Sequence, residues 1–371
     1  MQAVVITRPG GPEVLELREV PQPVPGPGEI LVRVAAAGLN RADILQRKGQ
    51  YPAPPGSPAD IPGLEYAGAV AALGPPAAAV SERAGDAATG ARAGVRAHRW
   101  RIGDRVMGLV GGGACAEYLV AHADTAIPAP DAWSRTVARE VAAATASRAG
   151  EPGHGEPEPL VLAAAVPEVF LTAYDALVLQ LGMKAGETVL VHAVASGVGT
   201  AALQLVKAWG ARCIGTSRSA EKLERARSLG LDVAIDSSRE DFVEAVRRET
   251  EGRGVDVVLD LVGGPYLEGN LKALAPRGRM VIVGLTAGRT APIDLGVVLN
   301  KRLTLVGTAM RSRALEERVA VARAFEREVL PLFAAGRLRP VLDRTFPMAQ
   351  VAEAHRVMEA DAHFGKLVLV W

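Results

Sequence analysis

The stretch Glu187–Ala202, reading ETVLVHAVASGVGTAA, limits the fold of this chain more than any other segment. Thr188–His192 is apolar or β-branched, as in a buried parallel strand, and it leads into a turn of small residues and an alanine-rich helix start. In such a unit the pyrophosphate of a dinucleotide approaches the backbone, and the N–H groups of the helix start attract its charge. The spacing Ala193-x-x-Ser196-x-x-Gly199 departs from G-x-G-x-x-G, so the turn alone could equally be a tight connection.

The segment after this turn repeats strand and helix, which favours the dinucleotide interpretation. Strands are predicted at Thr188–His192, Arg212–Thr216, Asp232–Asp236, Val255–Leu261, Arg279–Leu285 and Leu303–Thr308. Helices are predicted between them, near Leu203–Trp209, Glu221–Leu229, Asp241–Glu251, Tyr266–Leu274 and Leu295–Leu299. This alternation predicts a doubly wound parallel sheet, whose ligand lies beyond the carboxyl ends of the strands.

The two ends of the chain have a different pattern. Short strands separated by Gly and Pro turns predict a small barrel, at Ala3–Ile6, Leu15–Val20, Ile30–Ala36, Leu64–Leu73, Arg105–Val110 and Ala116–Val120. The last part reads as a long helix, a strand, a helix and a closing strand, over Leu315–Ala335, Leu338–Phe346, Met348–Glu359 and Gly365–Val370. We therefore expect a split domain of residues 1–166 and 312–371 around a dinucleotide domain of residues 167–311, with a cleft between them.

Composition excludes several classes of function. The 371 residues carry a net charge of +1, which gives no electrostatic reason to expect a nucleic acid or a membrane as partner. The start of the chain lacks a signal-peptide pattern and no uncharged stretch has the length of a membrane span, so a cytoplasmic protein is expected. Cys115 and Cys213 fall in different predicted domains, which favours two buried thiols over a disulfide or a metal site.

Two segments, Pro75–Arg99 and Trp133–Pro159, are rich in Ala, Gly, Pro, Arg and Glu and lack a sustained apolar period. We interpret both as surface insertions that carry no chemistry. The alternative is a lid or a docking loop, because long loops in compact domains are often functional.

Sequence blocks distributed over the chain resemble one known family. In order, they are GLNRADILQRKGQYPAPPG, GLEYAG, GDRVMGLVGGG, AVPEVFLTAYDAL, HAVASGVGTAALQL, LDLVGG and HFGKLVLV. With these blocks the chain resembles the zinc-free quinone oxidoreductases of the medium-chain dehydrogenase/reductase superfamily, near zeta-crystallin and the tumour-suppressor-induced branch.

This resemblance implies an α/β protein with a GroES-like β-barrel catalytic domain and a Rossmann domain, which is a doubly wound parallel sheet. It also implies NADPH as cofactor and a small-molecule quinone or enone as substrate, with an enoyl thioester as a further alternative. The cofactor-binding residues that it implies are Thr172, Ala195, Ser196, Gly197, Val198, Gly199, Ser217, Arg218, Lys222, Val262, Gly263, Leu285 and Lys366.

No metal site is expected. Metal-dependent relatives carry a cysteine near the position of Asn40 and Gly-His-Glu where this chain has Gly63-Leu64-Glu65, so both ligands are missing. The six histidines show no metal-binding spacing. His192 ends a predicted core strand and is interpreted as a buried, hydrogen-bonded imidazole rather than a catalyst.

Without a metal, catalysis consists mainly of placing the nicotinamide against an electron-poor carbon and excluding water. Asn40 and Tyr51 are the candidate catalytic residues, because an amide and a phenol can donate to a carbonyl oxygen. A helix cap is the alternative role of Asn40, and a loop aromatic that covers the cleft is that of Tyr51. A cofactor-binding protein without activity also stays open, although the presence of both residues favours an enzyme.

The choice of dinucleotide depends on the end of the second predicted strand of the sheet. NAD-selective domains place an acid about 20 residues beyond the glycine turn. This chain has Ser217 and Arg218 there, and Lys222 follows one helical turn later, which favours the 2′-phosphate of NADPH. The alternative is that both cations are simply solvated.

The last strand of the sheet, Leu303–Met310, is apolar and would leave an unpaired edge. Superfamily relatives pair this edge across a two-fold axis, so a homodimer is expected.

Overall fold

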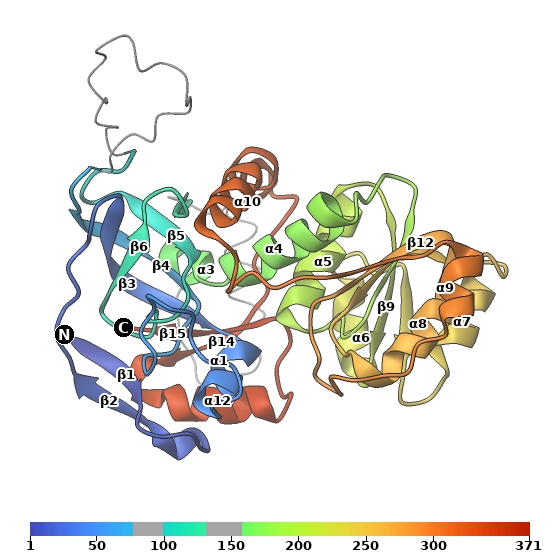
Figure 1. Ribbon diagram of the computed structural model, residues 1–371, viewed down its shortest axis with the longest axis horizontal. Helices are drawn as coiled ribbons and strands as arrows, with labels where there is room; N and C mark the ends of the chain where they lie inside the picture. Colours follow the sequence, from blue (N-terminus) through green and yellow to red (C-terminus); the bar gives the residue numbers. More distant parts are fainter. Residues whose placement is uncertain (77–98, 131–157) are drawn as a thin grey trace, which may run out of the picture.

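The structure is a computed structural model that describes residues 1–76, 99–130 and 158–371. It has two parts, a barrel of short strands and a sheet flanked by helices, with α4 (Pro167–Tyr174) and α10 (Leu315–Glu328) between them (Figure 1). The predicted insertions Pro75–Arg99 and Trp133–Pro159 fall almost entirely outside the described residues. The second is shorter than predicted, because Pro159 begins helix α3 (Pro159–Ala163).

The barrel contains strands from both ends of the chain, as predicted. A seven-stranded sheet has the order β14-β15-β3-β4-β5-β7, with β6 also paired to β3. Its strands are β3 (Glu29–Leu39), β4 (Glu65–Leu73), β5 (Arg105–Leu109), β6 (Tyr118–His122), β7 (Ile127–Pro128), β14 (Leu342–Pro347) and β15 (Lys366–Val370). A separate hairpin pairs β1 (Gln2–Ile6) with β2 (Leu15–Glu19). Strand β3 continues past the predicted end to Leu39 and leads into helix α1 (Arg41–Arg47), so Asn40 lies at this junction.

The second sheet is the predicted Rossmann sheet. Its order is β10-β9-β8-β11-β12-β13, and every neighbouring pair is parallel. Its strands are β8 (Thr188–Val191), β9 (Arg212–Ser217), β10 (Val233–Asp236), β11 (Val255–Asp260), β12 (Leu274–Ile282) and β13 (Thr304–Gly307). All overlap the predicted strands, but β12 begins at Leu274 rather than at Arg279 and ends at Ile282 rather than at Leu285. The order of strands therefore reverses between β8 and β11, which is where such sheets bind ligands.

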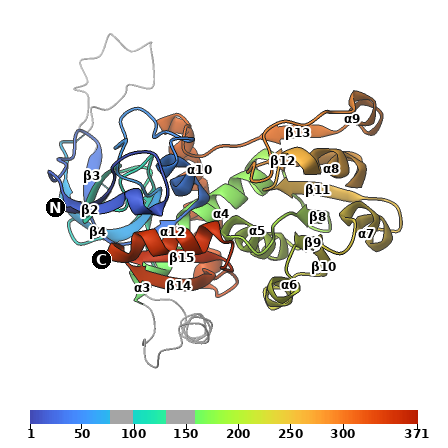
Figure 2. The ribbon, with the colours of Figure 1, turned by 90° about the horizontal axis from the view of Figure 1, so that it is seen from below.

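Helices cover both faces of this sheet (Figure 2). One face packs against α5 (Gly197–Ala208) and α6 (Ala220–Arg227), and the other against α7 (Phe242–Glu249) and α8 (Leu267–Ala273). Helix α9 (Leu295–Lys301) follows β12 and precedes the edge strand β13. Because both faces are covered, the strands can be almost continuously apolar, as β8 is.

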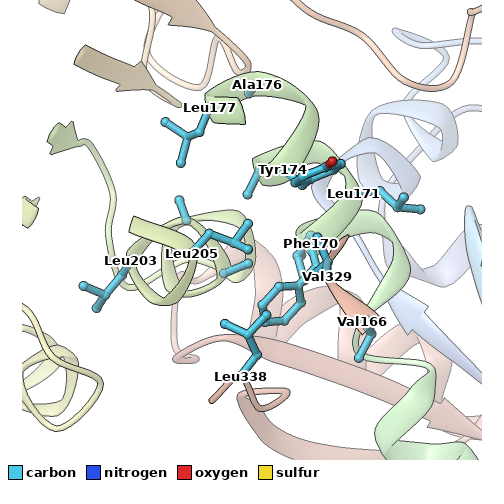
Figure 3. Close-up of a cluster of buried hydrophobic side chains, with 14 of the residues drawn as sticks. Val166, Phe170, Leu171, Tyr174, Ala176, Leu177, Leu203, Leu205, Val329 and Leu338 are labelled. Atoms are coloured by element: carbon cyan, nitrogen blue, oxygen red, sulfur yellow. The ribbon is translucent and has the colours of Figure 1, made fainter. Parts of the chain in front are cut away.

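A helical segment that the sequence patterns did not predict joins the two parts. Pro159–Gln180 has the length and mean hydropathy of a membrane span, but 89% of its apolar window is buried inside the protein, so it is a core helix here. In Figure 3 its side chains meet those of α5 and those of Val329 and Leu338 from the C-terminal part of the chain. The Phe170 ring, for example, packs edge-on against Phe333 with 4.8 Å between the centroids. One hydrophobic cluster thus spans the barrel and the sheet, and each part also has a separate core of its own.

The C-terminal segment corrects one prediction. The long helix expected over Leu315–Ala335 is two helices, α10 and α11 (Leu330–Ala334), which meet at Val329. Pro331 explains the break, because its ring lacks an N–H and clashes with the preceding turn of a helix. Helix α12 (Val351–Glu359) then leads through Asp361 into β15.

Candidate active site

The turn between β8 and α5 is built as the sequence predicted. Ser196 caps α5, and its hydroxyl accepts the Gly199 N–H at 3.1 Å. A Cβ atom on Gly199 would lie 2.3 Å from the carbonyl oxygen of Ala193, and one on Gly197 would lie 2.8 Å from Val169. The packing of the protein itself therefore requires both glycines. The turn can be a tight connection and also bind a phosphate, since α5 begins at Gly197, directly after β8 at the switch point of the sheet.

The other predicted cofactor residues gather at the same edge of the sheet. Ser217 ends β9, Val262 and Gly263 follow β11, and Leu285 follows β12. Gly263 has a φ of 79°, and a Cβ there would lie 2.8 Å from the carbonyl oxygen of Gly288. Leu285 is 44% exposed at this edge.

One observation at the other side of the turn supports a bound nicotinamide. Thr172 on α4 is buried, and its hydroxyl has no hydrogen-bond partner within the described part of the chain. A buried hydroxyl without a hydrogen-bond partner is unusual and costs free energy unless a bound ligand supplies the missing hydrogen bond. A carboxamide is the kind of group that would do so, so the residues present fit a nicotinamide dinucleotide.

Asn40, Glu65 and Lys366 form a buried polar cluster where β3 ends and where β4 and β15 begin. The Lys366 ammonium donates to the oxygen of the Asn40 amide at 2.7 Å and to the Leu39 carbonyl at 2.7 Å, and it lies 2.5 Å from Glu65 Oε1. The Asn40 amide nitrogen donates to Glu65 Oε1 at 2.9 Å and to the Gly38 carbonyl at 3.2 Å. All donors of both side chains are thus used inside the protein, while the Lys366 stem lies against Gly197 at the turn.

Asn40 occupies the cap position of α1, but its side chain does not cap the helix. Instead, the Asp43 carboxylate accepts the Asn40 N–H at 2.8 Å and the Gly63 N–H at 3.0 Å. Burial raises the pKa of Asp43 to about 6 in spite of these two bonds. The Asn40 amide thus contacts both Lys366 and Glu65.

Arg311 positions Tyr51. Its guanidinium donates to the Tyr51 carbonyl at 3.1 Å, to the Gly111 carbonyl at 2.7 Å and to Gln46 Oε1 at 2.6 Å, and it lies 5.0 Å from the centre of the Tyr51 ring. These contacts involve the backbone and ring of Tyr51. Burial raises the pKa of the Tyr51 hydroxyl, so it stays protonated near neutral pH.

Sequence reasoning missed Glu168, which lies in the first turn of α4. Together with Arg311 it lines a small cavity whose other walls are Leu64, Leu109, Val110, Met310 and Arg318. Burial, followed by the neighbouring Glu65 carboxylate, raises the pKa of Glu168 to about 7. The available signal was an acid inside the apolar block AVPEVFLTAY.

Two further interpretations of side chains are confirmed. His192 is fully buried and its ring nitrogens lie 2.9 Å from Thr216 Oγ1 and 2.7 Å from Asn270 Oδ1, which makes it a satisfied core residue. Cys115 and Cys213 are buried free thiols.

Two family profiles match the chain: an alcohol dehydrogenase GroES-like domain over residues 26–131 and a zinc-binding dehydrogenase domain over residues 197–326. Within the described residues, no group of three His, Cys, Asp or Glu side chains could hold a metal ion. In place of a metal ion, the Lys366 ammonium lies between the oxygens of the Asn40 and Glu65 side chains. The residues present therefore do not fit a catalytic zinc.

Individual relatives agree with these profiles. A quinone oxidoreductase of Pseudomonas aeruginosa is 33% identical and the match covers 97% of both chains. The phthioceranic/hydroxyphthioceranic acid synthase of Mycobacterium tuberculosis is 32% identical over 98% of this chain, but the chain spans only 15% of the length of that relative.

Solved structures show the same fold. A mycobacterial protein in complex with NADPH is 29% identical with a TM-score of 0.77, and the match covers 100% of both chains. The CurK enoyl reductase is 25% identical with a TM-score of 0.77, over 100% of this chain and 98% of the other. On its sequence, its two sheets and these relatives, the chain belongs to the quinone oxidoreductase family of the medium-chain dehydrogenase/reductase superfamily.

Proposed function

We propose that the protein catalyses the NADPH-dependent, metal-independent reduction of a quinone. One observation carries this proposal: Thr172 and Glu168 lie one helical turn apart on the same side of α4. The first is a buried hydroxyl without a partner, on a helix that packs against α5, and the second lines a cavity; we propose that the nicotinamide lies next to the first. Cofactor and acceptor would then meet along a single buried helix that holds both in fixed positions.

Bound NADPH would supply the hydride, and the side chains of the cavity would supply position and protons. Glu168 and Tyr51 are the proposed proton donors, because the first has a pKa near neutrality and the second stays protonated. Asn40, the other predicted catalytic residue, would act through Lys366 and Glu65 as a positioning residue. Lys366 would contact the cofactor through its stem beside Gly197.

An enone or enoyl thioester is the second candidate substrate. The CurK enoyl reductase shares the fold, and the half-buried acid Glu168 favours a reaction in which hydride adds to the β-carbon and a proton must reach the α-carbon. A bound cofactor without turnover is the third possibility, because a fold alone does not establish activity.

A panel of acceptors tests the proposed function. The protein is mixed with NADPH and a benzoquinone, a naphthoquinone, an enone or a crotonyl thioester, and absorbance of NADPH at its nicotinamide band is followed. We expect turnover with at least one quinone and a lower rate for Tyr51→Phe with normal NADPH binding. NADPH binding without turnover of any acceptor would contradict an enzymatic function.

We also propose a domain division at residues 1–166 and 312–371 for the catalytic domain and 167–311 for the Rossmann domain. This division is supported by the strands that each sheet contains: the barrel sheet takes its strands from before residue 167 and after residue 311, and the Rossmann sheet takes its strands from the residues between.

A homodimer through the edge strand β13 is part of the same proposal. The exposed side chains of Ile293, Leu295 and Leu299 lie just before this strand, and Leu299 is 74% exposed. Such apolar exposure next to a sheet edge is typical of a covered surface. Light scattering should give twice the chain mass for the parent protein and a smaller mass for Leu299→Glu; a monomeric parent at micromolar concentration would refute the dimer.

A further inference from the structure

We infer that the carboxylate of Asp361 occupies the place of the cofactor 2′-phosphate, and that Arg41 is a third cation of this binding site. The inference rests on the proposed use of NADPH and assigns two residues that determine selectivity for it. We call Arg41, Arg218, Lys222 and Asp361 the Asp361 cluster.

The contacts of the Asp361 cluster come from distant parts of the chain. Arg41 Nη2 lies 2.5 Å from Asp361 Oδ1, and Arg218 Nη2 lies 2.9 Å from Asp361 Oδ2. The Lys222 ammonium donates to the Asp361 carbonyl. Arg41 begins α1 of the barrel part, which lies beside α12, whereas Arg218 directly follows β9 and Lys222 lies in α6 of the Rossmann part (Figure 1). Asp361 therefore contacts cations from both parts of the protein.

The cluster combines one carboxylate with three cations. Arg41 and Arg218 contact the carboxylate itself, and Lys222 contacts the backbone carbonyl of the same residue. A phosphate monoester carries close to two negative charges near neutral pH and has three oxygens that accept charge-assisted hydrogen bonds. If it takes the place of the carboxylate, it brings more negative charge to the two arginines and adds an oxygen that can accept from the neighbouring Lys222.

The contacts are also of a kind that can be exchanged. The side chains of Arg218, Arg41 and Asp361 are 76%, 40% and 48% exposed. Exposed ion pairs contribute little to stability, because water screens them. Asp361 has a left-handed backbone with a φ of 52°, so the loop presents this carboxylate at some conformational cost.

His363 gives a second, independent indication of a ligand at this place. Its side chain is buried, with 9% exposed, and its Nδ1 atom has no hydrogen-bond partner within the described part of the chain. Burial, then the charges of Lys222 and Arg41, lower its pKa to about 4, so the ring is neutral and lies close to the cluster. A ribose hydroxyl next to a 2′-phosphate is a group that could form a hydrogen bond with this nitrogen.

The consequence is a difference between two nucleotides. NADH has no 2′-phosphate and can bind while Asp361 keeps its cations. NADPH must displace the carboxylate, so Asp361 weakens the binding of NADPH while Arg41, Arg218 and Lys222 strengthen it. Asp361 is thus expected to reduce the preference for NADPH that the cations create.

Titrations of NADPH, NADH and 2′,5′-ADP into the full-length protein, followed by calorimetry, test this inference. Asp361→Asn keeps the size of the side chain and tolerates a positive φ. We expect it to tighten NADPH and 2′,5′-ADP about three- to tenfold, the factor that matches one exposed charge interaction, and to leave NADH within about twofold. Arg41→Ala should weaken NADPH by about tenfold and leave NADH unchanged.

Glu353→Gln is the matched control, because it changes the net charge by the same amount and removes an exposed ion pair, to Arg356, on the neighbouring helix α12. It should shift none of the three affinities. Equal effects of Asp361→Asn and Glu353→Gln, or weaker NADPH binding in Asp361→Asn, would overturn the inference while leaving the proposed function intact. If the parent protein binds neither NADPH nor NADH, both fail together.

Discussion

The buried polar cluster and the Asp361 cluster use similar groups in opposite settings. Lys366 and Glu65 are 3% and 0% exposed, and each Lys366 proton has an acceptor. Arg218 and Asp361 also form a pair of one cation and one carboxylate, but their side chains are 76% and 48% exposed to water. A buried pair is costly to break, because either partner alone is left as an uncompensated charge, whereas an exposed pair exchanges partners easily. Under the proposed function, the comparison distinguishes a fixed cluster at the proposed catalytic site from an exchangeable cluster at the proposed nucleotide site.

The largest effect should follow from breaking the buried pair. Lys366→Met leaves Glu65 without its cation, and we expect the free energy of unfolding to fall by about 3–5 kcal/mol. Denaturant titration measures this loss. The double variant Lys366→Met/Glu65→Gln removes both charges and should recover part of the stability. A single variant as stable as the parent would mean that the pair is not fixed as described.

A smaller effect, on rate, should follow from Glu168→Gln. Because burial and Glu65 raise the pKa of Glu168 to about 7, its carboxyl is protonated below neutral pH and the rate should fall as pH rises through about 7. Glutamine cannot supply this proton, so the rate should drop on the order of a hundredfold and lose this dependence on pH. Steady-state rates with a saturating acceptor between pH 5 and 9, at fixed NADPH, measure both. A parent-like pH profile in the variant would exclude Glu168 as the donor.

The same raised pKa has a consequence for stability. The folded state keeps a proton on Glu168 that the unfolded state releases above its ordinary value of 4.5. The stabilising contribution is therefore complete below about pH 4.5 and is lost as pH rises through about 7. The difference in unfolding free energy between parent and Glu168→Gln, measured across this range, should show this slope.

The smallest effect should come from the exposed cluster. Arg218→Ala should change the free energy of unfolding by less than about 1 kcal/mol, although it weakens NADPH binding by roughly tenfold. Thermal unfolding with and without NADPH separates the two quantities. A loss of stability as large as that of Lys366→Met would remove the contrast between the clusters.

Local patterns were enough to predict the Rossmann sheet. Each strand, such as Thr188–Val191, is a short apolar run between polar or glycine turns, so its place can be found from a few neighbouring residues. The same holds for the turn at Ser196–Gly199. The joining helix Pro167–Tyr174 could not be found in this way, because a helix buried on all sides lacks an amphipathic period.

The partners within each cluster could not be predicted. Asn40 and Lys366 are 326 positions apart, and Arg218 and Asp361 are 143 apart. Each residue was found or missed according to its own local motif. Only the fold shows that the Asn40 amide accepts a hydrogen bond from Lys366. Asp361 stands in no recognised motif, so nothing in the sequence placed it among three cations.

A crystal structure of the protein with NADP⁺ bound tests the account most directly. We predict that the 2′-phosphate lies among Arg41, Arg218 and Lys222, that the Asp361 carboxylate has moved away from the two arginines, and that Lys366 still contacts Leu39, Asn40 and Glu65. A 2′-phosphate bound elsewhere with the Arg218–Asp361 pair intact, or Lys366 moved from Glu65 to the cofactor, would contradict it.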